Sequence, residues 1–138
     1  MEKLLQAFSK HYAAGHEVTS FFKAHEKDFL TETTAQCLTR LRKERNMVVA
    51  DIIRNLEHGD YLYKVFQGTR TASRDVLLSI SIAMKLQPEE TNRLLCTAGL
   101  APLNQNVCRD FIIYWALKNE TPITKINDML YELAEKTL

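Results

Sequence analysis

Apolar residues recur every three or four positions along most of the chain, which is the spacing of one face of an α-helix. The first such stretch runs from Glu2 to about Ala13 and is followed by Ala14-Gly15, where glycine tolerates the left-handed conformation that ends many helices. A second short helix is expected from Glu17 to Phe29. Only four Gly and three Pro are present, which leaves little turn chemistry for a many-stranded β fold. The pattern therefore predicts an all-α protein.

Shorter elements follow in the middle of the chain. Thr31 is expected to cap a helix that ends near Asn46, because its hydroxyl can accept from an unpaired backbone N–H. Two further short helices are expected at Val49 to Leu56 and at Tyr61 to Gln67, with the turn Glu57-His58-Gly59-Asp60 between them. Asp60 is the expected N-cap of the second of these, and Gly68 is expected to end it.

The last third of the chain contains a repeated pattern. Ser73 is expected to cap a long apolar helix, and Gln87-Pro88 to begin another that stops at Gly99. Four features then recur 35 residues later: Arg74-Asp75 as Arg109-Asp110, Asn92 as Asn127, Leu95 as Leu130 and Leu103 as Leu138. This predicts a duplicated helical hairpin, the alternative being that any two amphipathic hairpins would align as well. We expect an N-terminal helical segment (1–30), a central domain (31–103) and a C-terminal hairpin packed on it (104–138).

Composition places the chain among soluble proteins. Hydrophobic residues make up 46% and charged residues 25%, and no apolar run approaches the roughly 18 residues that a membrane span needs. The N-terminus lacks the basic and apolar regions of a secretory signal, so a cytoplasmic location is expected. The formal net charge is +1, so overall charge does not indicate nucleic-acid binding.

Side chains that carry out catalysis or bind metals show no suitable spacing. Cys37, Cys96 and Cys108 are far apart and are expected to be buried, reduced thiols. The four histidines share no ligand spacing with cysteines or carboxylates, and no nucleophile motif or phosphate-binding glycine loop is visible. We therefore expect no enzymatic activity, no metal and no cofactor.

The central stretch has a distinctive order of features. A basic run, Arg40-x-Arg42-Lys43-x-Arg45, precedes two short helices, a glycine-ended polar loop and a Ser-capped helix. From about Thr33 to Leu95 this resembles the lambda-repressor-like (XRE, Cro/C1-type) helix-turn-helix family. The most specific part is Tyr61 to Leu78, with Gly68, Arg70 and Ser73 in register. The sequence after it looks like that of small bacterial proteins in which such a module carries a helical C-terminal extension.

The resemblance implies a transcriptional regulator that binds double-stranded DNA, with the helix Asp60 to Gln67 lying in the major groove. Lys64 and Arg70 are the leading candidates for DNA contacts. The full set of contacts that the resemblance and the local chemistry predict is Arg42, His58, Tyr61, Tyr63, Lys64, Gln67, Thr69, Arg70, Ser73 and Arg74. If the regulator is a dimer, the C-terminal helices supply its interface through Trp115 and Tyr131.

Several departures from the family pattern keep a second function open. Val48-Val49 stands where family members often place a phosphate-binding Gln, and Asp60 at the start of the recognition helix would face a groove lined by phosphates. Residues 31–88 contain nine Lys and Arg against six Asp and Glu, a surplus of three that suits only a few phosphate contacts. The alternative is a protein-interaction module or signalling adaptor that keeps the helix-turn-helix shape without binding DNA.

Overall fold

The structure, a computed structural model, describes residues 2–29, 31–57 and 59–138. Within these ranges every regular element is helical, with nine α-helices and one short 3₁₀ helix, so the all-α prediction is confirmed. The chain divides into two compact units, Met1–Thr31 and Glu32–Leu138, which are described separately. None of the helices in the described ranges has the length and apolar character needed to cross a lipid bilayer.

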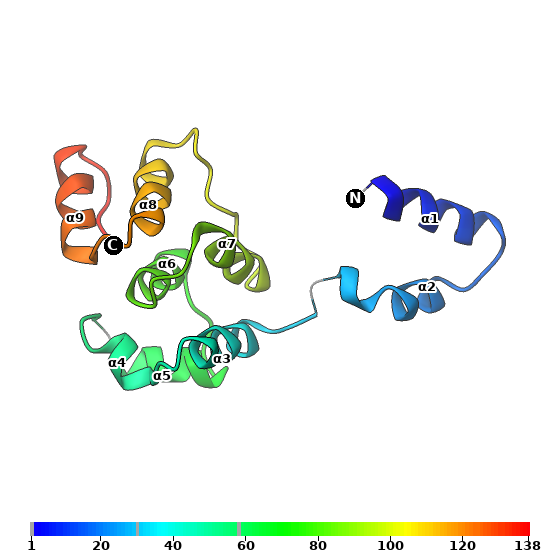
Figure 1. Cartoon of the computed structure of the whole chain (residues 1–138), viewed down its shortest axis with the longest axis horizontal. Helices are drawn as coiled ribbons and strands as arrows, with labels where there is room; N and C mark the ends of the chain where they lie inside the picture. The colour runs from blue at the N-terminus through cyan, green and yellow to red at the C-terminus, as the bar shows by residue number, and fades with distance from the viewer. Residues whose placement is uncertain (1, 30, 58) are drawn as a thin grey trace. The chain divides into compact units, whose positions relative to one another are not determined.

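The first unit is a small helical hairpin. Helix α1 (Glu2–Ala13) is followed by a turn at Gly15, by α2 (Val18–Ala24) and by the 3₁₀ helix η1 (Glu26–Asp28) (Figure 1). The expectation of one helix from Glu17 to Phe29 is wrong, because His25 leaves the helical conformation, with φ −118° and ψ 28°. Aromatic rings join the two helices, with the centroids of Phe8 and Phe21 5.1 Å apart.

The described part of the second unit contains seven helices, which lie in three layers (Figure 1). One outer layer contains the first three of these helices, the middle layer the next two and the other outer layer the last two. Their bounds are α3 (Thr34–Glu44), α4 (Val49–Ile53), α5 (Gly59–Gln67), α6 (Arg74–Ala83), α7 (Pro88–Thr97), α8 (Cys108–Lys118) and α9 (Ile123–Glu132). Helix α3 packs on α5 and α7, α4 packs on α5 and α6, and the α8–α9 pair packs on α6 and α7.

Most predicted helix ends in this unit are confirmed. Asn46 ends α3 with a left-handed φ of 53°, and Gly68 ends α5 with φ 83°. The hydroxyl of Ser73 accepts a hydrogen bond from the N–H of Val76 at 3.2 Å, which caps α6 as expected. Helix α7 begins at Pro88 directly after Gln87.

Three predicted ends are corrected. The N-cap of α3 is Thr33 and not Thr31, because Thr33 and Gln36 form a reciprocal capping box with hydrogen bonds of 3.1 and 2.9 Å. Helix α4 ends at Ile53 and not near Leu56. Helix α5 begins at Gly59, so Asp60 lies in its first turn and is not its N-cap.

One continuous hydrophobic core runs through all three layers of the second unit. Each of the helices α3 to α9 contributes side chains to it. The largest fully buried ones are Leu38, Leu41, Ile52, Leu77, Leu78, Ile80, Met84, Leu86, Leu94, Leu95, Ile113 and Ile126. All three cysteines are free thiols. The expectation that all three are buried is wrong, since only Cys37 is buried and Cys96 and Cys108 are exposed.

The repeat predicted from the 35-residue spacing is present in the structure. Helix α8 begins and ends close to 35 residues after α6, and α9 begins and ends 35 residues after α7. Each hairpin turn has one left-handed residue, Lys85 in the first and Glu120 in the second. The side-chain carbonyl of Asn92 accepts from the N–H of Leu103 at 2.8 Å, and Asn127 accepts from Leu138 at 2.7 Å. The α6–α7 hairpin and the α8–α9 hairpin are therefore structural copies of each other.

Charged side chains join the two copies reciprocally. Arg74 of α6 donates to Asp110 of α8 at 3.0 and 2.8 Å, and Arg109 of α8 donates to Asp75 of α6 at 2.9 Å. An exchange in which each copy gives the other the same contact is the mark of a two-fold axis. Helices α6 and α8 are thus related by an internal pseudo-two-fold.

Candidate nucleic-acid interface

Helix α5 is strongly amphipathic, and its polar side faces solvent. Leu62, Val65 and Phe66 are buried in the core. On the other side Asp60, Tyr63, Lys64 and Gln67 are exposed. The same i, i+3, i+4 spacing that fixes the helix to the core thus presents a continuous polar face. His58, a predicted contact, lies outside the described residues.

Backbone hydrogen bonds fix the conformation of the loop after α5. The N–H groups of Thr69 and Arg70 both donate to the carbonyl of Lys64, at 3.0 and 3.3 Å. Gly68 permits this turn because its φ of 83° is left-handed, and a Cβ added there would lie 3.1 Å from the Cβ of Ala35. The hydroxyl of Thr69 also donates to the Lys64 carbonyl, at 3.3 Å. The loop therefore keeps Arg70 exposed next to the end of α5.

Three exposed cations border the polar face of α5. Lys64 lies on α5, Arg70 on the loop after it and Lys43 on α3. Within the part of the chain that the structure describes, none of the three has a carboxylate within 4.0 Å. Unpaired cations on one surface are what an anionic partner requires.

Gln67 connects two hollows on this surface. A depression of about 400 Å³ between α3 and α5 is lined by Lys43, Phe66 and Gln67, among others. A groove of about 770 Å³ on the other side of Gln67 is lined by Gln36, Gly68 and Arg70, among others. Lys43 was not among the predicted contacts, although it belongs to the basic run that the sequence showed. Its place beside Gln67 depends on how α3 packs on α5, which no local pattern specifies.

The remaining cations of the basic run are occupied or turned inward. Arg40 forms ion pairs with Glu32 and Glu44, at 2.9 and 3.2 Å. The hydrogen bond from Arg40, which outweighs partial burial, lowers the pKa of Glu32 to about 2. Arg45 pairs with Glu90 of α7. Arg42, a predicted contact, is half-buried and donates to the carbonyl of Met47 at 3.2 Å.

Three other predicted contacts have roles inside the protein. The hydroxyl of half-buried Tyr61 donates to the carbonyl of Thr71. Ser73 caps α6, although its hydroxyl remains exposed. The guanidinium of Arg74 uses all three of its nitrogens, because besides Asp110 it donates to the carbonyls of Ala101 and Pro102 at 3.1 and 3.2 Å. Four of the five N–H donors of Arg74 are used within the protein, so we leave it out of the interface.

Comparison of the chain with protein-family models, curated proteins and solved structures finds no match. In residues 2–29, 31–57 and 59–138, no group of three or more His, Cys, Asp or Glu side chains is placed to hold a metal ion.

The candidate interface consists of the exposed predicted contacts and one added cation. These are Tyr63, Lys64 and Gln67 on α5, Thr69 and Arg70 on the loop, and Lys43 on α3. We call this set the α5 face.

Proposed function

We propose that the unit Glu32–Leu138 is a DNA-binding transcriptional regulator in which α4 and α5 form a lambda-repressor-like helix-turn-helix. The observation that carries this proposal is the α5 face, where three unpaired, exposed cations surround the polar side of a short helix anchored by its other side. In a helix-turn-helix the second helix lies in the major groove and its neighbours hold the phosphates. Helix α5 is that second helix, and its buried residues orient it.

The side chains divide into two kinds of contact. Arg70 and Lys43, at the two margins of α5, bind phosphate oxygens, which gives affinity without sequence preference. Lys64 and Gln67 project from α5 itself and reach base edges, where glutamine pairs with adenine and lysine with guanine. Ser73 supplies a hydroxyl donor near Arg70, because its oxygen accepts from Val76 and its own proton is not used in that bond.

Asp60 limits which sites bind well. It is exposed in the first turn of α5, where a carboxylate repels phosphates and can accept a hydrogen bond only from a donor such as the cytosine N4 amino group. With few cations and this carboxylate, non-specific affinity is low. The protein then depends on specific base contacts more than a strongly basic regulator does.

The proposal is tested by binding to random duplex DNA at several salt concentrations. Phosphate contacts release counterions, so the binding constant should fall as salt rises from about 50 to 200 mM, with a log–log slope of about 0.9 for each phosphate contact. Arg70→Ala and Lys43→Ala should each lower that slope by about one unit. Lys64→Ala should weaken binding as well.

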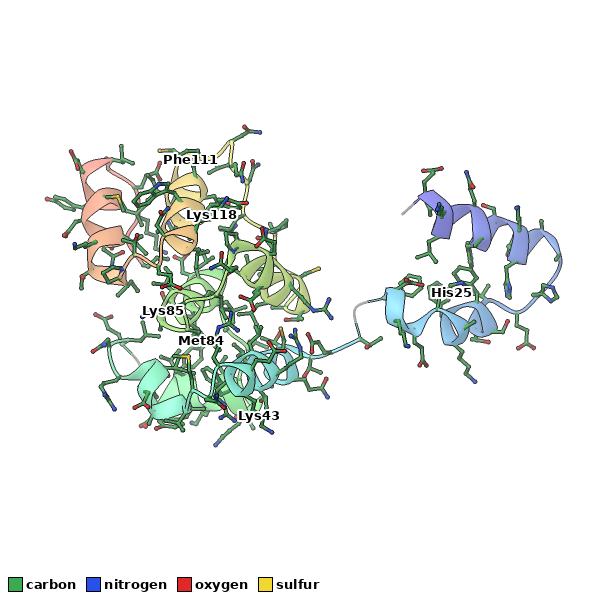
Figure 2. The ribbon with its side chains drawn as sticks, viewed as in Figure 1. His25, Lys43, Met84, Lys85, Phe111 and Lys118 are labelled. Carbon is green, nitrogen blue, oxygen red and sulfur yellow. The ribbon has the colours of Figure 1, made fainter. Side chains whose placement is uncertain are left out.

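Lys118→Ala is the matched control. It removes one exposed lysine from α8, far from α5 in the layered arrangement (Figure 2), and changes the net charge equally. Binding should stay within about twofold of the wild type, since the lysine lies outside the interface. Loss of binding in the control as large as in Arg70→Ala would contradict the proposal. No retention on DNA even at low salt would also contradict it, and would favour a protein partner for the face carrying Asp60 and Tyr63.

A further inference from the structure

The internal duplication leaves two helix contacts of the first copy without counterparts in the second. In the first copy, α4 packs on α6 and α3 packs on α7. Across the described part of the chain, the main contacts of α8 are with α6, α7 and α9, and those of α9 are with α6 and α8. In Figure 1 the middle layer, α6 and α7, is covered on both sides, whereas α8 and α9 form an outer layer. The pseudo-two-fold therefore relates a covered face of α6–α7 to an uncovered face of α8–α9.

Large apolar side chains occupy this uncovered face. Ile80 of α6 is 0% exposed, and its counterpart 35 residues later, Trp115, is 46% exposed. The counterpart of half-buried Val76 is Phe111, which is 53% exposed and is labelled at the outer end of α8 in Figure 2. Leu133, the residue that follows α9, is 47% exposed and corresponds to half-buried Ala98. At each of these three positions the second copy carries a side chain that is both larger and more exposed than in the first. Exposing this much apolar surface costs free energy unless another surface covers it.

We propose that a second copy of this chain covers the face formed by Phe111, Trp115 and Leu133, about a two-fold axis that brings the two α9 helices together antiparallel. The aromatic pair from α8 provides the desolvated centre that dominates the energy of such interfaces. This proposal does not depend on DNA binding by α5.

The charges on α9 are reversed relative to those on α7. This reversal disfavours α3 and α4 of a second molecule as the elements that cover the α8–α9 face. In the first copy Glu90 of α7 pairs with Arg45, and Arg93 pairs with Glu32 at 3.1 Å. The positions 35 residues later are Lys125 and Asp128, with the signs exchanged. A second molecule's α3 would therefore place like charges opposite each other, which is unfavourable.

A second α9, in contrast, matches these charges. Lys125 and Asp128 are exposed and three residues apart, and no ion pair of 4.0 Å or less is found for either within the described ranges. When two such helices run antiparallel, the lysine of each faces the aspartate of the other. The surface is thus complementary to itself.

The same argument removes Tyr131 from the expected dimer interface. Its counterpart in the first copy is Cys96, which is exposed although α3 and α4 cover the neighbouring face. Tyr131, which is 81% exposed on α9, thus corresponds to a position that the cover of the first copy leaves open. It provides a control two residues before Leu133.

The test is sedimentation equilibrium of the full chain from about 1 to 100 µM, a range that spans typical dissociation constants of weak dimers. Phe111→Glu and Leu133→Glu should each raise the dimer dissociation constant by about tenfold or more, and Tyr131→Glu should leave it within about twofold. Lys125→Asp should weaken the dimer, and adding Asp128→Lys to it should restore association. Helical circular dichroism of each variant shows whether the monomer is still folded.

Trp115 provides a second readout because it is the only tryptophan in the chain. Its emission should shift to shorter wavelength, and its quenching by acrylamide should fall, over the same concentrations at which the dimer forms. A chain that stays monomeric throughout would overturn the proposal. So would a dimer that Phe111→Glu and Leu133→Glu leave intact while the quenching of Trp115 stays constant.

Discussion

Gly68 is the residue on which the position of Arg70 depends. Two constraints require glycine there. Its φ of 83° is left-handed, and a Cβ at this position would lie too close to the Cβ of Ala35. Gly99 also has a left-handed φ, 69°, but no atom lies within 4 Å of its added Cβ. The two glycines therefore share the conformational requirement and differ in the available space.

Alanine substitution separates these constraints. Gly99→Ala should lower the free energy of unfolding by about 1–2 kcal/mol, the cost of a left-handed L-residue. Gly68→Ala should cost more, because the loop and α3 must also move apart to make room between the new methyl group and Ala35. Urea denaturation of both variants measures the difference. Equal losses would show that the close approach to Ala35 has no energetic consequence.

Among the elements, α6 and α8 are joined by ion pairs that make the duplicated hairpins sensitive to acid. Burial raises the pKa of Asp110, but the hydrogen bonds from Arg74 and from the N–H of Asn104 outweigh it, so its pKa is lowered. Asp75 is similar, with burial outweighed by Arg109. A lowered carboxyl pKa in the folded state contributes stability above the unfolded-state pKa of 3.8 and loses it as the pH falls through the folded-state value.

Asp110→Asn should therefore destabilise the protein at pH 7 by about 3 kcal/mol, because it leaves the partly buried Arg74 without its counter-charge. It should also weaken the loss of stability that the wild type shows as the pH falls below about 4, through the unfolded-state and then the folded-state pKa of this carboxyl. Urea denaturation as a function of pH measures both effects. Asp51→Asn is the control, since Asp51 and Arg54 form an exposed pair that contributes little. An unchanged pH dependence in Asp110→Asn would refute the role given to this pair.

The element ends show what the sequence could predict. Gly68, Ser73 and Pro88 were placed correctly, because each acts through local backbone chemistry. The expected cap at Thr31 is wrong, because the reciprocal hydrogen bonds between Thr33 and Gln36 fix the start of α3 two residues later. The sequence shows both Arg–Asp motifs, 35 residues apart. It does not show that Arg74 pairs with Asp110, because that pairing depends on how the two copies pack across the pseudo-two-fold.

For the whole molecule, the two proposed interfaces lie on different layers of the unit Glu32–Leu138. The α5 face belongs to the layer of α3, α4 and α5, and the apolar face of Phe111, Trp115 and Leu133 belongs to α8 and to the end of α9. Sequence patterns identified the first through Lys64 and Arg70. The second was visible only in part, since Trp115 and Tyr131 look alike on a helical pattern and only the comparison of the two copies separates them.

DNA binding by the α5 face can be measured by a titration of the ¹⁵N-labelled full chain with duplex DNA at low salt. We expect the amide resonances of Lys64 to Arg70 and of Lys43 to change first and most, because the proposed complex places these groups against the nucleic acid. Resonances of α8 and α9 should change little. Changes confined to α8 and α9, or none at any ratio of DNA to protein, would show that the α5 face does not bind DNA.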